Sequence, residues 1–160
     1  MLIRRMTESD IDAVLDLMQR NDDGILAEFH SAEVLAEFRA EMTPQDEREH
    51  MVRNQVFVVE EEGQVVATGA LADLGTSREP RYIVSQFAVR PDRHRRGIGT
   101  LLLAHLVSGA LDVHTDTLHV PSSRNAIPFY EHAGFTIDAL QPDTAIEITW
   151  MTKRLCGRPA

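Results

Sequence analysis

The residues whose types and spacing best predict chemistry lie in a basic segment with two glycines, residues 90–100 (Arg-Pro-Asp-Arg-His-Arg-Arg-Gly-Ile-Gly-Thr). An apolar run typical of a strand, 83–89, precedes this segment, and a helix-like run, 101–107, follows it. Gly97 and Gly99 allow the backbone to approach a ligand without interference from a Cβ atom. A turn between a strand and a helix start directs backbone N–H groups at one point, where they can bind an anion. The segment therefore predicts an anion-binding turn.

The arginines of this segment support the same prediction. Arg93, Arg95 and Arg96 lie beside the expected helix start, where positive charge opposes the helix dipole. A bound polyanion would account for them. The formal net charge of the whole chain is −9, so the cluster is a local positive region on an acidic molecule. Such a region suits a small polyanionic ligand better than a nucleic acid, and the acidic remainder would attract a cationic second substrate.

The glycine pattern alone does not identify the anion. Leu102 occupies the place of the third glycine of a dinucleotide-binding fingerprint, and no Gly-Lys-Ser/Thr follows, as a Walker A loop would require. A strand-to-helix turn that is merely basic stays an alternative at this point.

Length and composition predict a single domain spanning residues 1–160. No run of about 18 apolar residues is present, so no membrane helix is expected. Charged residues follow within the first few positions and no apolar stretch is present there, so no signal peptide is expected. The lone Cys156 cannot form an internal disulfide, a pattern compatible with a reducing cytoplasm. Neither His132 nor Cys156 shows a metal-ligand spacing, so no metal is expected.

The apolar periodicity predicts the order β-α-α-β-β-β-α-β-α-β-β, with a further polar, exposed helix at 45–53. In the last strand, Ile146, Ile148 and Trp150 alternate and predict a buried face. Hairpins followed by β-α-β units imply a mixed sheet with helices on both sides. Strands are expected at 2–5, 56–59, 65–71, 82–89, 117–120, 135–139 and 146–150, and the main helices from 11 to within 21–24, from Ser31 through 38, and at 100–110 and 126–133.

A second segment with chemical potential is 125–135 (Asn-Ala-Ile-Pro-Phe-Tyr-Glu-His-Ala-Gly-Phe). Asn125 is a good helix N-cap, Pro128 is tolerated in a first helical turn, and Gly134 can end the helix. The hydroxyl of Tyr130 can serve as a general acid at a reacting centre. A core aromatic with an exposed hydroxyl is the other interpretation of this residue.

Together the two segments resemble the GCN5-related N-acetyltransferase (GNAT) family. In that family an apolar strand leads into Arg/Gln-x-x-Gly-x-Gly/Ala at a helix start, and residues 87–102 are similar to this pattern. Residues 126–135 are similar to the second signature of the family, and the spacing and order of elements agree over nearly the full chain. The resemblance implies an α/β (α+β) fold with a mixed, mostly antiparallel central sheet of six or seven strands, flanked by about four helices.

The resemblance also implies acetyl-CoA as co-substrate. The strand residues Phe87, Ala88 and Val89 would offer backbone groups to the pantetheine arm, at a place where the family's sheet splays open. Tyr130 would protonate the departing CoA thiolate. The pyrophosphate would be held by the amides of His94, Arg95, Arg96, Gly97, Ile98, Gly99 and Thr100, with the Arg95 or Arg96 side chain at the rim, and Ser123 or Asn125 would lie near the far end of the arm.

Two positions depart from the family pattern. His94 stands where the family has Arg or Gln, which puts the contact of that side chain in doubt but not the binding by the amides. Ser123 takes the slot of the family's usual Asn before the second helix, and Asn125 lies two residues later.

The reaction that the resemblance implies is direct attack of a primary amine on the thioester in a ternary complex. Many members of the family carry a carboxylate on the strand before the turn, but Ile-Val-Ser-Gln at 83–86 offers none. A water chain is one way to deprotonate the amine. The side chains considered as the base are Glu60, Asp73, His119 and Glu147.

The acceptor would lie between the first helices and the last strands. That region carries Asp22, Asp23, Glu28, His30, Gln141 and Asp143. The acidic bias favours a cationic amine, such as a polyamine, an aminoglycoside or a lysine side chain, and a solvated acidic loop explains it equally well.

The alternative function is a non-catalytic CoA-binding or sensing domain on the same fold. A small-molecule or peptide amine is the expected partner, with no nucleic acid and no membrane. A homodimer is compatible with the resemblance, and the expected location is the cytoplasm.

Overall fold

The computed structural model describes residues 1–40, 42–141 and 147–156, and these form one seven-stranded sheet in the order β1-β2-β3-β4-β5-β7-β6. All neighbouring strands are antiparallel except β4 and β5. The strands are β1 (Leu2–Arg5), β2 (Gln55–Glu61), β3 (Gln64–Asp73), β4 (Tyr82–Val89), β5 (Thr117–Ser122), β6 (Thr136–Ile137) and β7 (Thr149–Arg154). The α-helices are α1 (Ile11–Gly24), α2 (Ala32–Ala40), α3 (Pro44–Arg53), α4 (Ile98–Asp112) and α5 (Ile127–His132), with 3₁₀ turns η1 (Glu8–Asp10), η2 (Leu26–Glu28), η3 (Pro91–Arg93) and η4 (Arg124–Ala126).

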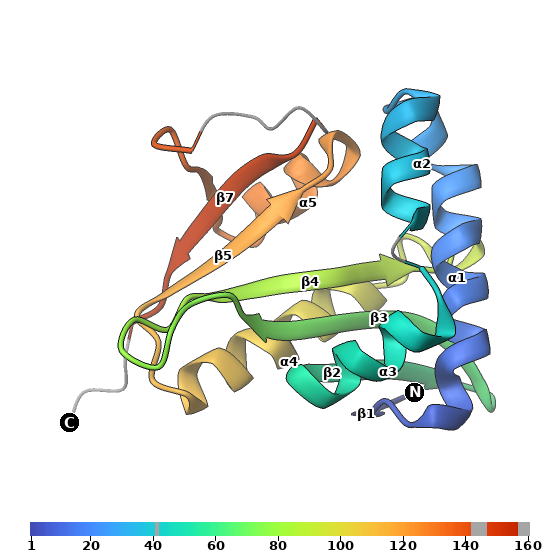
Figure 1. The fold of residues 1–160 in the computed structure, drawn as a ribbon, viewed down its shortest axis with the longest axis horizontal. Helices are drawn as coiled ribbons and strands as arrows, with labels where there is room; N and C mark the ends of the chain where they lie inside the picture. The colour runs from blue at the N-terminus through green and yellow to red at the C-terminus, as the bar shows by residue number, and fades with distance from the viewer. Residues whose placement is uncertain (41, 142–146, 157–160) are drawn as a thin grey trace.

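The sheet opens into a wedge between its two parallel strands. β4 and β5 share a single register pair, Ile83 with His119, and then diverge (Figure 1). β4 keeps its ladder with β3 as far as Val89, but beyond Ile83 its other edge has no register partner in β5. The wedge therefore exposes strand N–H and C=O groups to the space between the two arms, as the resemblance predicted.

Helices cover both faces of the sheet, and the residues alternate accordingly. The α4 face is covered by α4 and α5, where Leu106, Leu118 and Met151 are fully buried. The α3 face is covered by α1 and α3, with Val14 and Val58 in its core. Figure 1 shows α4 behind the central strands and α3 in front of them. No helix in the described parts of the chain is both long and apolar enough to cross a membrane.

The fold class predicted from the sequence is confirmed, but three elements differ from expectation. The strand expected at 135–139 is reduced to Thr136–Ile137. The last strand is Thr149–Arg154 rather than 146–150, and Thr149 and Met151 are its buried residues, not Trp150. Pairing with β5 sets this phase: Met151 lies opposite the core residue Val120, and Trp150 opposite Pro121. Ile146 lies outside the described residues.

The third difference is in α3, which was expected to be wholly exposed. Its Glu47 is only 1% exposed. The sequence of the helix is mostly polar, so burial of this carboxylate is decided by what the helix packs against.

The N-terminal strand is tied to the first helix by a buried carboxylate. Arg4 Nη1 and Nη2 donate to Asp10 Oδ2 and Oδ1 at 2.7 and 2.8 Å. The backbone N–H of Thr7 also donates to Asp10 Oδ2, at 2.8 Å. The hydrogen bonds from Arg4, more than those from Thr7, lower the pKa of Asp10 to about 2. Asp10 therefore stabilises the fold above its unfolded pKa of about 4, and this contribution is lost as the pH falls through about 2.

We expect Asp10→Asn to lower the free energy of unfolding by about 1–2 kcal/mol at neutral pH, with part of the interaction discounted because Arg4 is partly exposed. The difference from the unmodified protein should vanish as the pH approaches about 2. Urea unfolding at neutral and acidic pH measures it. Asp16→Asn is the matched control, since Asp16 forms an exposed pair with Arg20 and its loss should change little. Equal effects of both substitutions would contradict the assignment.

Candidate active site

A bulge in β4 shapes the wedge at its centre. Ala70 pairs with Ser85 and Thr68 with Ala88, so Gly69 faces two residues, Gln86 and Phe87. Gln86 takes the extra position with a left-handed φ of 46°. The bulge keeps Phe87 on the α4 face, where it crosses Gly69 so closely that a Cβ there would lie 3.0 Å from the Phe87 ring. It also frees the side chain of Gln86 from the regular pleat.

The basic turn ends in the start of α4, as the sequence predicted. Arg95 and Gly97 adopt left-handed backbone conformations, with φ of 61° and 78°. The first backbone hydrogen bond of the helix runs from Leu101 N–H to Gly97 C=O at 3.0 Å. Within the described chain, no hydrogen bond is donated by the amides of residues 95–100. First-turn amides lack an acceptor inside a helix, so this end of α4 can bind an anion.

The arginines of the turn are largely paired with carboxylates. Arg90 contacts Asp92 at 2.8 Å, and Arg93 and Arg96 lie 3.6 and 3.8 Å from Glu61 of the β2–β3 hairpin. Arg95 is exposed and forms no ion pair within the described residues. The turn is therefore less positive than its sequence suggests, and its backbone amides and Arg95 are the groups left for an anion.

His94, the departure from the family pattern, has a structural contact instead. Its Nε2–H donates to the carbonyl of Val89 at 2.8 Å. This bond ties the turn to the end of β4, while the amides that follow His94 stay free. The side chain of His94 is therefore engaged in a contact within the protein.

A groove of about 290 Å³ runs between α4 and α5 on the α4 face. It begins at Thr100, next to the turn, and Lys153 of β7 closes it by donating from Nζ to Ala133 C=O at 2.5 Å. Its lining is mainly apolar, and the groove leads from the anion site along α4. The residues that line it are Thr100, Leu103, Ala104, Val107, Phe129, His132, Ala133 and Lys153.

Tyr130 of α5 packs against the strand that carries the bulge. It is 4% exposed, and its ring lies 6.1 Å from the ring of Phe87 and 5.1 Å from that of Phe129, centroid to centroid. Burial raises the pKa of Tyr130 well above its ordinary value, so its hydroxyl stays protonated at neutral pH. The structure thus brings the two chemically suggestive segments of the sequence together at β4.

Ser123 and Asn125 follow β5 on the opposite arm of the wedge. Ser123 Oγ donates to Asn125 Oδ1 at 2.8 Å, and both residues are half-buried. The two residues that the sequence left as alternatives are therefore linked to each other.

The residues expected near the acceptor divide into two groups. Asp22 is buried and lies 3.7 Å from Arg39 of α2, and Asp23 also pairs with Arg39. Desolvation by burial, which outweighs the attraction of Arg39, raises the pKa of Asp22 to about 6. These two carboxylates join α1 to α2, and Glu28 is exposed. The acidic bias of the sequence is thus in part a structural ion-pair network.

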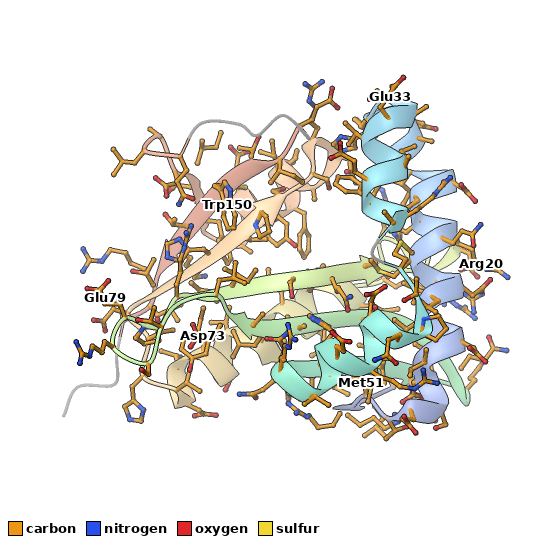
Figure 2. The ribbon with its side chains drawn as sticks, in the orientation of Figure 1. Arg20, Glu33, Met51, Asp73, Glu79 and Trp150 are labelled. Carbon is orange, nitrogen blue, oxygen red and sulfur yellow. The ribbon has the colours of Figure 1, made fainter. Side chains whose placement is uncertain are left out.

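The second group is divided between two places: His30 lies beside Glu147, and Gln141 lies beside Arg81 at the closed end of the wedge. His30 is buried, and its Nδ1 lies 3.2 Å from Glu147 Oε2, while Arg124 approaches Glu147 Oε1 at 3.8 Å. Gln141 accepts a hydrogen bond from Arg81, whose guanidinium covers the ring of Trp150 at 4.8 Å. Figure 2 shows Trp150 on the arm formed by β5 and β7. Asp143 lies outside the described residues.

The four base candidates from the sequence differ in position. Glu60 is paired with Arg4 at 3.0 Å, away from the wedge. Asp73 accepts hydrogen bonds from the amides of Gly75 and Arg81 at 2.8 Å, and it lies at the closed end of the wedge (Figure 2). His119 lies beside Ile83, where β4 and β5 meet, and burial, with the charge of Arg81, lowers its pKa. Glu147 is held by His30, as above.

The sequence analysis missed one buried carboxylate beside the bulge. Glu47 Oε1 accepts a hydrogen bond from Gln86 Nε2 at 2.7 Å. The available signal was weak: Glu47, His50 and Met51 follow the i, i+3, i+4 spacing of an inward helix face, but two of the three are polar.

The comparisons with known proteins agree with this architecture. Residues 52–137 match the family model described as an acetyltransferase (GNAT) domain. The wedge-shaped mixed sheet defines a protein of the acetyltransferase fold class, and the chain belongs to the GNAT acetyltransferase family. No curated protein sequence matches the chain.

Three solved structures illustrate the similarity. The PaiA N-acetyltransferase of Thermoplasma acidophilum, in complex with coenzyme A, is 15% identical with a TM-score of 0.80, covering 96% of this chain and 98% of that one. The ribosomal-protein-alanine N-acetyltransferase of Brucella melitensis is 24% identical (TM-score 0.68; 97% and 100% covered). YncA of Salmonella typhimurium, with acetyl-CoA, is 21% identical (TM-score 0.71; 100% and 96% covered). At these sequence identities the similarity is evidence for the fold of this chain alone.

Proposed function

We propose that the protein is an N-acetyltransferase that moves the acetyl group of acetyl-CoA to a primary amine. The observation that carries the proposal is the set of free amides at residues 95–100, at the end of the same strand β4 whose edge is unpaired and against which Tyr130 packs. Membership of the GNAT family supports it, as do the similar structures solved with coenzyme A or acetyl-CoA.

Acetyl-CoA would bind from the start of α4 into the wedge between β4 and β5. The amides from Arg95 to Thr100 would hold the pyrophosphate, with Arg95 and then Arg96 assisting from the rim. The amide of His94, which the sequence included in this set, donates instead to Pro91 C=O at 3.4 Å. The free edge of β4 at Phe87, Ala88 and Val89 would bind the pantetheine arm, with Ser123 or Asn125 on the opposite arm. Acetyl-CoA supplies the activated thioester, and strand N–H groups near Val89 would stabilise the negative charge that develops on its carbonyl oxygen.

Tyr130 would act as the general acid for the leaving thiolate. Its burial against Phe87 supports this role because a protonated hydroxyl is then available beside β4 throughout the neutral range. Binding both substrates in the wedge would add the rate advantage of proximity, so that the amine attacks directly.

The donor half of the proposal is tested by thermal unfolding with acetyl-CoA and with ATP at the same concentration. A ligand at a hundredfold excess over its Kd stabilises the folded state by about 2.7 kcal/mol. For a chain of this length, we expect a rise in Tm of about 5–10 °C with acetyl-CoA and a smaller rise with ATP, which lacks the pantetheine arm. No rise with acetyl-CoA would contradict the donor assignment.

The transfer half is tested by CoA release with spermidine, kanamycin and a lysine-containing peptide as acceptors. Acetylated product with any of them supports the enzyme. Binding of acetyl-CoA without turnover across the panel would favour the alternative, a CoA-binding domain without catalysis.

A further inference from the structure

β4 lacks the carboxylate that many members of the family carry on this strand. β4 carries Ser85 and Gln86 beside the bulge, and neither can take a proton from an ammonium ion at neutral pH. The bulge, however, aims Gln86 at α3, where its Nε2–H donates to Glu47 Oε1 at 2.7 Å. A carboxylate from a helix thus reaches the α3 face of the same strand. It lies on the side of the sheet opposite to α4.

The surroundings of Glu47 do not explain it as a structural ion pair. Its residue is 1% exposed, and no Lys, Arg or His of the described chain forms a salt bridge with it. Arg48, the next residue of α3, is instead paired with Glu8 at 3.2 Å. Glu47 Oε2 is buried and makes no hydrogen bond with any described residue. Burying a carboxylate without a cation destabilises the folded state, and a neutral side chain of similar size at this position would destabilise it less.

Burial and the charge of Asp46 favour uptake of a proton by Glu47, whereas the hydrogen bond from Gln86 opposes it. Burial, more than the hydrogen bond from Gln86, sets its pKa, which is raised above the ordinary glutamate value, and Asp46 raises it further. His50, one turn along α3, is neutral because burial lowers its pKa. A base works best when its pKa approaches the working pH, and the raised pKa of Glu47 shifts in that direction.

We propose that Glu47 is the general base that deprotonates the acceptor amine, and that Gln86 is the residue that positions it. The acceptor class that follows is an aliphatic amine that enters as an ammonium ion, because its charge complements the buried carboxylate. This inference rests on the proposed acetyl transfer, and it adds the base and the protonation state of the acceptor.

The proton balance is complete with these residues. Glu47 takes one proton from the ammonium ion, and the neutral nitrogen attacks the thioester carbonyl carbon. The C–N bond forms and the C–S bond breaks, while Tyr130 gives its proton to the CoA sulfur. The second proton of the nitrogen restores Tyr130, and Glu47 releases its proton to solvent.

The test compares the unmodified protein with Glu47→Gln, and uses Glu49→Gln on the exposed side of α3 as the matched control. CoA release is measured with spermidine, kanamycin and the lysine peptide, and with hydroxylamine, which is already neutral at neutral pH. We expect Glu47→Gln to lower turnover of the ammonium acceptors by about 10²- to 10³-fold at neutral pH, with little change for hydroxylamine. The deficit should shrink at alkaline pH, where the amine loses its proton without help. Glu49→Gln should behave like the unmodified protein.

A second variant distinguishes loss of the base from a general structural defect. The double substitution Glu47→Gln with Gln86→Glu moves the carboxylate across the 2.7 Å hydrogen bond to the strand. We expect it to recover at least about tenfold of the lost turnover, since a base is again present beside the bulge. Unchanged turnover in Glu47→Gln would overturn the proposal. So would an equal loss with hydroxylamine and the amines at every pH, which indicates a structural defect.

Failure of the proposed function has a different signature. If the unmodified protein releases no CoA with any nucleophile, acetyl transfer itself fails. The base assignment then fails with it, because no acceptor amine remains to be deprotonated. If instead the unmodified protein releases CoA and only the Glu47→Gln comparison fails, the base assignment alone is overturned.

Discussion

Replacing Tyr130 by Phe is expected to lower kcat by about 10²- to 10³-fold, within the range that a positioned general acid contributes. Phe retains the ring contacts with Phe87, Phe129 and Phe135, so the packing of α5 against β4 should survive. Only the hydroxyl proton is lost, and the thiolate must then leave without a partner. The rise in Tm caused by acetyl-CoA should stay close to that of the unmodified protein, because the amides of the turn do not change.

The matched control is Tyr82→Phe, which removes the hydroxyl of the other tyrosine of the chain, at the closed end of the wedge. It should leave kcat unchanged. Burial raises the pKa of Tyr130, so its titration should not limit the rate at mildly alkaline pH. Turnover in Tyr130→Phe equal to that of the unmodified protein would show that another group or water protonates the thiolate.

The parts of the site that the sequence predicted are those encoded locally. The turn at 90–100 reads as strand, glycine-containing turn and helix start, and each feature depends on residues a few positions apart. Tyr130 was likewise identified from a local pattern, the segment 125–135. Both segments form the predicted helices, with α4 beginning at Ile98, but Asn125 lies within the 3₁₀ turn η4 and does not cap α5, whose N-cap is Ala126. The sequence did not predict which residues from other elements pack against these two segments.

The features that the sequence did not predict depend on pairing between distant strands. The bulge at Gln86 arises because Phe87 must stay on the α4 face opposite Gly69, a constraint that appears only once β3 and β4 are in register. The same bulge brings Gln86 to Glu47, 39 positions away in the chain. The phase of β7 is likewise set by β5, since Met151 pairs with Val120. A polar helix such as α3 gives no periodic signal for such a contact.

The charge clusters differ most from what the sequence predicted, because their charges are paired across distant elements. Glu61, from the β2–β3 hairpin, approaches both Arg93 and Arg96, and Arg39 of α2 engages Asp22 and Asp23. Each charge cluster thus has a partner from a distant element. Binding of a polyanion at the turn then depends more on the geometry of the backbone amides than on the number of arginines, and the geometry can be tested directly.

Gly97→Val is expected to weaken acetyl-CoA binding by about tenfold or more. Gly97 has a φ of 78°, and a Cβ there would meet no atom within 4 Å, so the substitution acts through the backbone alone. A β-branched residue in this left-handed conformation costs about 1–2 kcal/mol. The turn can relieve that strain by leaving the conformation in which the amides converge. A loss of about 1.4 kcal/mol in binding is a tenfold rise in Kd.

Gly63→Val is the control that separates donor binding from strain. Gly63, in the β2–β3 hairpin, has a φ of 75° and equally open space around its Cβ position. Both substitutions should lower the free energy of unfolding by a similar amount, about 1–2 kcal/mol, because the backbone strain is the same. Only Gly97→Val should also raise the Kd for acetyl-CoA, measured by calorimetry at a temperature where both variants are folded. Equal affinities in the two variants would mean that the amides of the turn do not hold the donor, and the anion site would then have to be built from the arginine side chains.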